Sequence, residues 1–253
     1  MIEHEFRRSS LSVTLARPPV NAINRDWIER FDAILDELAT RSGVSLVTIR
    51  SSQRLFSAGA DLKLMRDCFG GETGPAEMVE TVRRMQRLYD RIERLPQVTM
   101  AVIGGAAFGG GLELALSCDL RVAANEAQMG LPEARLGLLP GAGGTQRLSR
   151  LCGPGVARRL ILAAQTVSGI EARELGIVQW AAPAAELDAL AGRIAADVSE
   201  MSPHALAACK QCLAVADGSA QHGMAVELHH TGDLLNNADT RARVSDFLKR
   251  RGG

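Results

Sequence analysis

Two glutamates stand beside glycine-rich segments, where carboxylates can do acid–base chemistry. Glu113 follows Gly109-Gly-Gly111 near the start of an apolar segment, and Glu133 follows a proline in the loop Met129-Gly-Leu-Pro-Glu133. A glycine-rich turn at the start of a helix exposes free N–H groups and the positive end of the helix dipole, which suits an oxygen that becomes negative during a reaction. Two carboxylates around such a site would form the acid–base pair needed to move protons beside a carbonyl group.

Each feature alone has a simpler explanation. Glu113 could be a partner of its helix dipole, and a lone loop glutamate such as Glu133 is usually solvated. The turn Phe56-Ser-Ala-Gly-Ala-Asp-Leu62 has small residues that let a ligand approach backbone N–H groups, but by itself it is an ordinary strand-to-helix turn. The combination of the three segments indicates a reaction site.

Other chemistries find less support. The sequence has no Gly-x-x-x-x-Gly-Lys phosphate loop, no Gly-x-Gly-x-x-Gly after a strand, no Gly-x-Ser-x-Gly and no His-Glu-x-x-His. Cys209-Lys-Gln-Cys212 lies inside a helical stretch, without a second pair to complete a zinc site. The pair His229-His230 has no further His or Cys at ligand spacing, so we interpret it as a surface or interface feature. We therefore expect no metal and no cofactor.

The composition is that of a globular protein without a dominant charge. The 253 residues are 46% hydrophobic, with 29 basic and 29 acidic side chains. A neutral chain argues against nucleic-acid binding, because phosphate contacts need a basic excess. The first residues are too acidic for a signal peptide and no apolar stretch reaches membrane-spanning length, so we expect a cytoplasmic protein that does not bind membranes. Five scattered cysteines are typical of reduced thiols.

Strand and helix patterns alternate for three quarters of the chain. Apolar alternation predicts a strand over 4–16, and the spacing after Asn24, a suitable N-cap, predicts a helix over 25–40. Further expected elements are strands over 44–50, 98–103, 120–123 and 177–180, a long helix to about 95, a helix over 112–117, a glycine- and proline-rich loop over 130–144, a capping box at Ser168-Gly-Ile-Glu171 and helices from about 184 onward. This order predicts an α/β core followed by a helical tail.

Several motifs in order and spacing resemble the crotonase, or enoyl-CoA hydratase/isomerase, family. The resemblance runs from about Leu11 to the C-terminus, although Ala242-Arg243 stands where that family often has Glu-Gly. The motifs are Arg17-Pro-Pro-Val-Asn-Ala-Ile-Asn24, Ala58-Gly-Ala-Asp61, Gly109-Gly-Gly-Leu-Glu113, Leu131-Pro-Glu133, Pro140-Gly-Ala-Gly-Gly-Thr-Gln-Arg147 and Ser202-Pro-His-Ala-Leu206 with Lys210.

The resemblance implies a fold, an assembly and a site. The fold would be a spiral of ββα repeats over residues 1–195, followed by a helical region over 196–253 that mediates trimer formation, with two trimers usually stacking into a hexamer. The peptide N–H groups of Ala60 and Gly110 match the family's oxyanion hole, and Glu113 and Glu133 match its two catalytic glutamates. By the same resemblance, the substrate's CoA part would lie along Val20, Ala22, Ala58, Asp61, Leu62 and Lys63.

The implied activity is hydration of a 2-enoyl-CoA, because family members that only shift double bonds commonly keep one glutamate. The stretch Gly111–Ala124 also looks like methylglutaconyl-CoA hydratases, so a branched substrate is an alternative, and an isomerase is a weaker one. From a different class, a non-catalytic scaffold or RNA-binding relative stays open. The acyl pocket is not identified by sequence; its candidates, which could equally be core residues, are Met65, Cys68, Phe69, Met85 and Leu136.

Overall fold

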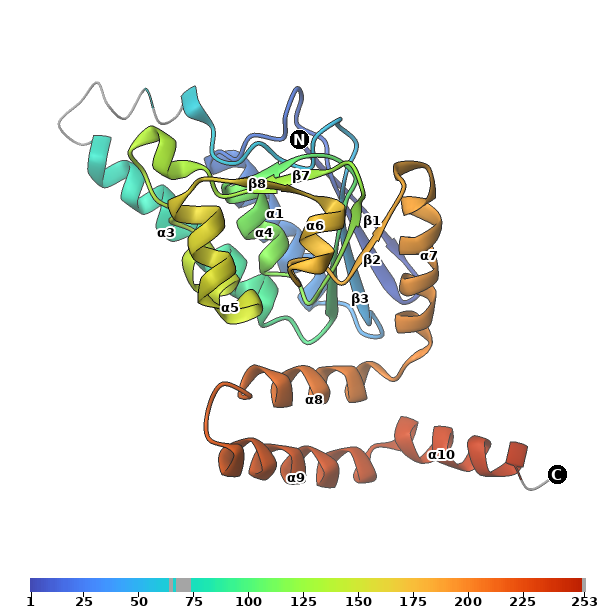
Figure 1. Ribbon diagram of the computed structural model, residues 1–253. Helices are drawn as coiled ribbons and strands as arrows, with labels where there is room; N and C mark the ends of the chain where they lie inside the picture. The colour runs from blue at the N-terminus through green and yellow to red at the C-terminus, as the bar shows by residue number, and fades with distance from the viewer. Residues whose placement is uncertain (64–65, 67–73, 252–253) are drawn as a thin grey trace.

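Two sheets and the helices that connect them form the core of the protein (Figure 1). The computed structural model describes residues 1–63, 66 and 74–251. The larger sheet has the order β1-β2-β3-β4-β6-β9, and the smaller one has the order β5-β7-β8. The strands are β1 Ile2–Arg7, β2 Ser10–Leu15, β3 Leu46–Ser51, β4 Val98–Ile103, β5 Ala107–Phe108, β6 Leu120–Ala124, β7 Gln128–Gly130, β8 Thr166–Ser168 and β9 Trp180–Ala182.

Helices alternate with these strands and then form the C-terminal tail. They are α1 Arg25–Ala39, α3 Gly74–Glu93, α4 Gly110–Leu116, the short 3₁₀ helix η1 Glu133–Leu136, α5 Gly144–Leu162, α6 Gly169–Glu174, α7 Ala184–Glu200, α8 Pro203–Ala214, α9 Ala220–Asn236 and α10 Ala238–Arg251. The chain passes from β4 in the large sheet to β5 in the small sheet and then to α4. It repeats the step through β6, β7 and the helices η1 and α5, which is the ββα spiral of the predicted fold class.

Local sequence explains why the first helix forms where it does. The Asn24 side chain accepts a hydrogen bond from the Trp27 N–H at 2.9 Å and so caps α1. The buried face of α1 repeats at intervals of three and four residues, as expected for an amphipathic helix on a sheet. Its members are Trp27, Ile28, Phe31, Ile34, Leu35 and Leu38. The capping box at Ser168 and Glu171 is also confirmed, at the start of α6.

Three sequence-based boundaries are wrong. The strand expected over 4–16 is an antiparallel pair, β1 and β2, that turns at Arg8-Ser9. Alternation continues through both strands, and the turn has no Gly, Pro or Asn to mark it. The strand expected over 177–180 begins at Trp180, and the helix expected from Leu112 begins at Gly110. In the last case the glycines were expected to precede the helix, whereas Gly110 and Gly111 form part of its first turn.

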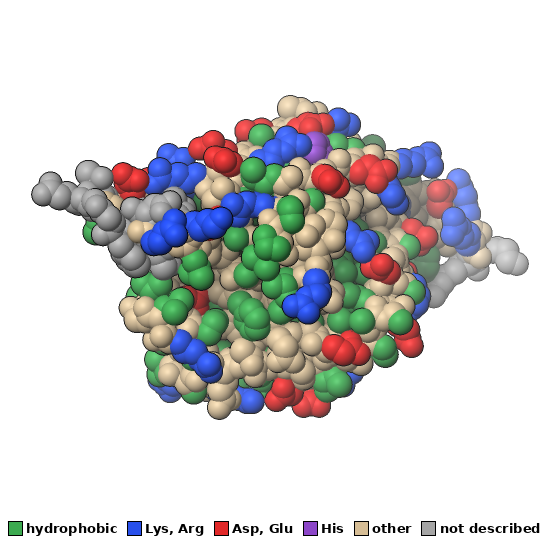
Figure 2. Space-filling model, turned by 90° about the horizontal axis from the view of Figure 1, so that it is seen from above, with side chains coloured by type: hydrophobic (Ala, Val, Ile, Leu, Met, Phe, Trp, Pro, Cys, Tyr) green, Lys and Arg blue, Asp and Glu red, His purple; other side chains and the backbone are tan. Residues whose placement is uncertain are grey.

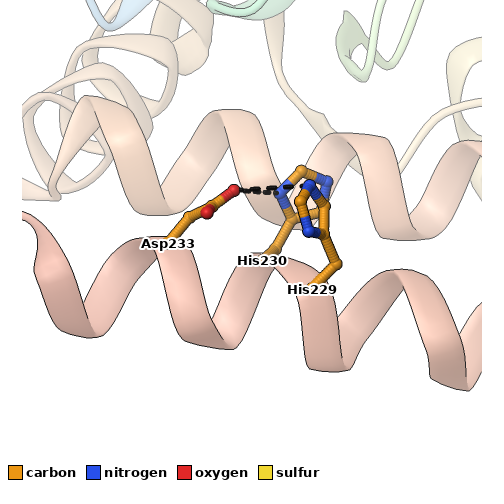
Figure 3. A group of neighbouring side chains, drawn as sticks. All are labelled: His229, His230 and Asp233. Carbon is orange, nitrogen blue, oxygen red and sulfur yellow. Dashed lines mark ion pairs between the residues drawn. The ribbon is translucent and has the colours of Figure 1, made fainter.

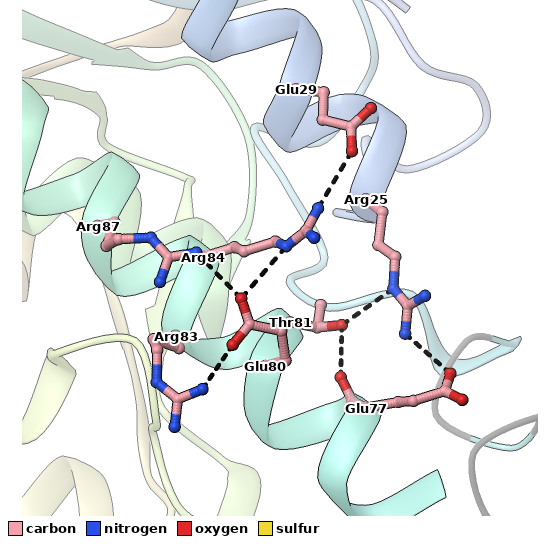
Figure 4. A network of polar contacts seen from close by, with 8 residues as sticks. All are labelled: Arg25, Glu29, Glu77, Glu80, Thr81, Arg83, Arg84 and Arg87. Atoms are coloured by element: carbon pink, nitrogen blue, oxygen red, sulfur yellow. Dashed lines mark hydrogen bonds and ion pairs between the residues drawn. The ribbon is translucent and has the colours of Figure 1, made fainter. Parts of the chain in front are cut away.

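An ionic network joins α1 to α3 on the outside of the core (Figure 4). Arg25 of α1 pairs with Glu77 of α3 at 3.0 Å, and Arg84 of α3 pairs with Glu29 of α1 at 3.1 Å. Because these side chains are partly solvated, each pair contributes little to stability by itself. The inner face of α3, which includes Met85, Leu88, Tyr89 and Ile92, is buried and packs beside the candidate site.

The helices α8 to α10 extend away from the core, below it in Figure 1. The α8 helix is attached through Lys210, whose Nζ lies 2.6 Å from Asp119 Oδ2 and donates to the Gln97 carbonyl at 2.8 Å. Large apolar side chains of the three helices are exposed, among them Leu213, Met224, Leu228, Leu235, Phe247 and Leu248. An exposed apolar surface of this kind is typical of a protein–protein contact.

The predicted boundary between residues 195 and 196 falls inside α7, which packs on the large sheet. As a division into two domains it stays a prediction. Lys and Arg side chains lie among Asp and Glu side chains on the face seen in Figure 2, in keeping with the zero net charge. Within the described residues, no helix combines the length and apolar character needed to cross a bilayer.

Candidate active site

The N-terminus of α4 lies at the centre of the candidate site. Gly109, with φ +51°, turns the chain from β5 into the helix, and its N–H donates to the Gly130 carbonyl at the end of β7 at 3.0 Å. The buried Tyr89 of α3 donates its hydroxyl to the Gly110 carbonyl at 2.8 Å. The first turn of α4 is thus held from β7 and from α3.

The turn at residues 58–61 packs directly against this helix start. The Ala58 N–H donates to Val20 O at 3.0 Å, and the Ile23 N–H donates to Gly59 O at 2.8 Å, so the turn is joined to the segment 17–24. Gly59 has φ +90°, and a Cβ there would lie 2.8 Å from the Phe108 carbonyl. Only glycine therefore permits this close approach of two backbones.

The N–H groups of Ala60 and Gly110 meet at this contact. A Cβ built on Gly110 would lie 3.6 Å from the Ala60 nitrogen, which places the two peptide units next to each other. Within the described part of the chain, neither N–H donates a hydrogen bond to a protein acceptor. Two adjacent N–H donors at a helix N-terminus can bind an oxygen on which negative charge develops.

Glu113 is a buried carboxylate one turn into α4. Its Oε1 accepts hydrogen bonds from the Ala142 N–H at 2.8 Å and the Gly144 N–H at 2.7 Å. Burial raises the pKa of Glu113 to about 7; the charge of Glu133 adds to this rise, and the two N–H donors and Arg147 oppose it. A carboxyl group with this pKa can both accept and release a proton near neutral pH.

Glu133 is the second carboxylate of the site. It begins η1, and a Cβ built on Gly109 would lie 2.7 Å from its Oε1, so the carboxylate stands over the turn that opens α4. Its Oε2 is buried and has no hydrogen-bond partner within the described residues. Burial raises the pKa of Glu133 as well. A buried carboxylate oxygen without a partner is a costly feature, which points to a chemical role.

The six residues expected along a CoA moiety lie on two backbone segments that are hydrogen-bonded to each other. One segment carries Val20 and Ala22, and the other carries Ala58, Asp61, Leu62 and Lys63. Arg17 fastens them together, because its guanidinium lies 2.7 Å from Asp61 Oδ2 and donates to the Ala22 carbonyl at 2.6 Å. The Arg17 contacts hold the pKa of Asp61 below its ordinary value, against the opposing effect of burial.

Two of the five acyl-pocket candidates can be placed. Met85 is buried on the inner face of α3, and its Cε would lie 2.7 Å from a Cβ built on Gly110. Met85 therefore lies beside the two N–H donors. Leu136, in contrast, is 65% exposed at the end of η1. The other three candidates, Met65, Cys68 and Phe69, lie outside the described residues.

The cysteine and histidine motifs lie away from this site, on the C-terminal helices. Cys209 and Cys212 are free thiols on α8. His229 and His230 have a neighbour that the sequence analysis did not consider, because Asp233 follows one helical turn later (Figure 3). Their ligand-type atoms lie within 4.8 Å of one another, with His229 Nε2 at 3.5 Å from Asp233 Oδ2. Contacts between side chains one helical turn apart are common on helix surfaces, and His229 and Asp233 are exposed here.

Comparison with known proteins places this geometry in a family. The sequence model described as enoyl-CoA hydratase/isomerase matches residues 5–252. A probable enoyl-CoA hydratase of Bacillus subtilis is 37% identical over 94% of this chain and 92% of its own length. The chain belongs to the enoyl-CoA hydratase/isomerase family.

Other members of the family agree in fold and differ in substrate. An enoyl-CoA hydratase structure from Bacillus anthracis superposes with a TM-score of 0.91 at 30% identity, covering 98% of this chain and 96% of that one. A methylglutaconyl-CoA hydratase of Mus musculus is 41% identical, but over 62% of this chain and 49% of its own length. The predicted family and fold class are therefore confirmed.

The sequence did not reveal which groups hold the Glu113 carboxylate in place. The motif Pro140–Arg147 contributed to the resemblance, but no role was predicted for the N–H groups of Ala142 and Gly144 or for the Arg147 side chain. The one available signal was the glycine-rich segment before α5, which is followed by a single arginine. It does not say which side chain the N–H groups would bind.

Proposed function

We propose that this chain is an enoyl-CoA hydratase, which adds water reversibly to a trans-2-enoyl-CoA to give a 3-hydroxyacyl-CoA. The observation that carries the proposal is the position of two carboxylates, the buried Glu113 and the half-buried Glu133, around the glycine-rich start of α4. Burial raises the pKa of both groups, and for Glu113 it does so to about 7, so Glu113 can accept or release a proton near neutral pH. Full-length similarity to a probable enoyl-CoA hydratase also supports it.

In the proposed reaction, the two carboxylates transfer protons and the backbone N–H groups stabilise negative charge. Glu113, ionised and fixed through its Oε1, takes a proton from water as the water oxygen bonds to C3 of the substrate. The electron pair of the C2–C3 double bond moves toward the thioester, whose oxygen becomes negative and accepts hydrogen bonds from Ala60 and Gly110. Glu133 then donates its proton to C2. One such N–H donor is worth roughly 2.7–4 kcal/mol in comparable sites.

No metal or other cofactor is needed for these steps, because the two carboxylates supply and remove every proton. Coenzyme A enters as part of the substrate, along the edge formed by Arg17, Asp61 and their neighbours. The exposed Leu62 and Lys63 at the end of this edge are suited to the pantetheine and phosphate parts of CoA, respectively.

A branched or acidic substrate is a second candidate. The similarity to a methylglutaconyl-CoA hydratase, at 41% identity over 159 residues, favours it. A double-bond isomerase is less supported, because the chain has both glutamates. A non-catalytic or RNA-binding role is also less supported, since the net charge is zero and such a role would not explain the buried carboxyl group of Glu113.

We further propose a homotrimer or hexamer in the cytoplasm. The exposed apolar side chains of α8, α9 and α10 support an assembly through these helices. The four cysteines within the described residues are free thiols, as expected in a reducing compartment.

A substrate panel tests the proposal. Purified protein is given straight-chain 2-enoyl-CoA thioesters of increasing length, a 3-enoyl-CoA and 3-methylglutaconyl-CoA, and loss of the enoyl-thioester absorbance is followed with product identification. Hydration of at least one 2-enoyl-CoA is expected. Conversion of the 3-enoyl-CoA alone would replace the hydratase proposal with an isomerase. Inactivity on every thioester, together with a shifted RNA band at physiological salt, would contradict it.

A further inference from the structure

Helix α3 is attached through its more exposed side chains to the loop that supplies the N–H donors for Glu113. Gln86 donates its Nε2–H to the Gly141 carbonyl at 2.6 Å. Arg147, whose side chain is 5% exposed, donates through Nη1 to the Ala142 carbonyl at 3.0 Å. The remaining nitrogens of this guanidinium bind α3, with Nη2 at 2.6 Å from Asp90 Oδ1 and Nε at 2.9 Å from Glu93 Oε2.

The Gln86 contact leads to Glu113 through a single peptide unit. The carbonyl of Gly141 and the N–H of Ala142 belong to the same peptide, so Gln86 donates to one end while the other end donates to Glu113 Oε1 at 2.8 Å. Hydrogen bonds arranged in series through a peptide polarise one another. A donor on the Gly141 carbonyl therefore strengthens the bond from the Ala142 N–H.

Arg147 holds the next part of the loop by its shape as well as its charge. Its Nη1 passes so close to Gly143, which has φ +106°, that a Cβ on this residue would lie 2.2 Å away. The backbone of Gly143 is thus fixed between the Arg147 side chain and the helix start, where the Gly144 N–H donates to Glu113. A planar guanidinium with several donors can make these contacts at once, which a lysine cannot do.

The same helix also contacts the candidate oxyanion site through its buried face. Tyr89, three residues after Gln86 and one before Asp90, donates its hydroxyl to the Gly110 carbonyl. The described charged or titratable groups around Glu113 are Glu133 from η1, Arg147 from α5 and the neutral Tyr89 from α3, with Asp90 and Glu93 behind Arg147. Helix α3 thus contacts both the loop that holds Glu113 and the peptide of Gly110 at the oxyanion site.

We infer that Gln86 and Arg147 are positioning residues for Glu113. They act without touching substrate, by holding the 141–144 backbone so that two N–H groups stay directed at one carboxylate oxygen. This inference rests on the proposed hydratase function for its kinetic consequences. Its structural content is that the ionised form of Glu113 depends on two side chains that lie on the far side of the loop.

Two substitutions test this without changing the charge around Glu113. Gln86→Met keeps the size of an exposed side chain and removes the donor to Gly141. Arg147→Lys keeps the positive charge but removes the planar guanidinium group with its several N–H donors. Each weakens the hydrogen bonds that favour the ionised carboxylate, so the pKa of Glu113 should rise further above its ordinary value. The acid limb of the kcat/KM profile for hydration should therefore move to higher pH.

We expect the limb to move by about one pH unit for Arg147→Lys and by less for Gln86→Met, since hydrogen bonds to a charged group are among the stronger ones. At pH 7, kcat should fall on the order of 10-fold in the lysine variant while KM changes little. Arg150→Gln is the matched control, because Arg150 lies on the same helix and pairs with the same Glu93, at 3.6 Å, but is 55% exposed and makes no hydrogen bond to the described loop.

An unshifted acid limb in both variants, with melting temperature lowered or not, would overturn the inference and leave only a packing role. If Arg147→Lys does not fold, the limb of Gln86→Met decides. If the wild type hydrates no thioester, the proposed function fails but the inference is still decided, because Glu113 titrates with or without turnover. The variants would then be compared by the pH dependence of their unfolding free energy, with Glu113→Gln as the reference.

Discussion

The Oε1 atom of Glu113 accepts a hydrogen bond from the Gly144 N–H at 2.7 Å, across the contact between α4 and α5. The Ala142 N–H binds the same oxygen at 2.8 Å, so both donors converge on one atom and neither engages Oε2. A carboxylate held in this way has a fixed plane and a second oxygen available to a water molecule. Positioning of this precision is a large part of catalysis when two reactants must meet at one carbon.

Replacement of either glutamate by glutamine should remove most of the activity. Glu113→Gln and Glu133→Gln keep the side-chain size but can no longer exchange a proton, and each such role is typically worth about 10²–10⁴-fold. We expect kcat to fall by that amount with KM changed much less. Steady-state kinetics on the best substrate of the panel measures this. Near wild-type turnover in either variant would exclude that residue from the chemistry, provided that circular dichroism shows it folded.

The Glu113→Gln variant should also become relatively more stable as pH rises. The folded-state pKa of Glu113, about 7, lies above its ordinary value of 4.5, so the native state binds this proton more tightly than the unfolded state does. The stability that this proton provides is present below about pH 4.5 and is lost as pH rises through 7. In the ionised range the cost to the wild type is on the order of 3 kcal/mol.

Urea unfolding of both proteins between pH 4.5 and 8 measures this difference. The gap in favour of Glu113→Gln should grow through this window and then level off. Glu174→Gln, on the exposed side of α6, controls for the exchange of a carboxylate for an amide. A gap that does not change with pH would show that Glu113 is not held in a strained, buried state.

Sequence reasoning succeeded where the signal is local. The cap at Asn24 and the buried face of α1 are both encoded within a few residues, and the structure confirms them. Glu113 could be singled out because three glycines precede it. The hairpin between β1 and β2 was missed because Arg8-Ser9 has none of the residues that usually mark a turn.

The support of Glu113 could not be predicted because it depends on a loop conformation. Gly144 lies 31 residues from Glu113 along the chain. Their contact depends on the conformation of Gly143, which has φ +106° and directly precedes α5. The buried state that raises the pKa of Glu113 likewise comes from several distant segments packed together. Spacing along a sequence carries no information on such a contact.

Activity should survive exhaustive dialysis against a chelator. The proposed chemistry uses two carboxylates and two N–H groups, and the group His229, His230 and Asp233 lies on α9, outside the candidate site. Turnover before and after dialysis, with metal content by elemental analysis, measures this. His230→Ala, made in parallel, should have wild-type kcat. Loss of activity that added zinc restores would reverse the interpretation of these histidines.

Light scattering at micromolar concentration should give the mass of a hexamer, or of a trimer. The reason is the exposed apolar surface of the C-terminal helices, in which Leu228 is 74% and Leu235 63% exposed. Leu228→Asp combined with Leu235→Asp should shift the mass toward the monomer by placing charges in an apolar contact. Leu162→Asp is a control of equal exposure, 74%, at the end of α5. A monomeric wild-type mass would contradict the proposed assembly.

Two neighbouring glycines of α4 should respond differently to alanine. A Cβ on Gly110 would meet the flexible end of Met85 at 2.7 Å, which can move aside. A Cβ on Gly111 would meet the Ser57 backbone oxygen at 2.6 Å, and backbone cannot yield so easily. Gly110→Ala should therefore fold with a nearly unchanged melting temperature, whereas Gly111→Ala should lose stability, by roughly 1–3 kcal/mol as for other overpacked sites.

The kinetics of the two variants should show the opposite order. The added methyl group of Gly110→Ala lies beside the N–H groups of Ala60 and Gly110, where the thioester oxygen would bind. Loss or misalignment of one such donor costs about 10²–10³-fold in kcat. Gly111→Ala should retain more of its kcat per folded molecule, because the residue supports the turn without forming the donor pair. A lowered melting temperature in Gly110→Ala, with kcat per folded molecule preserved, would mean that Gly110 serves packing alone.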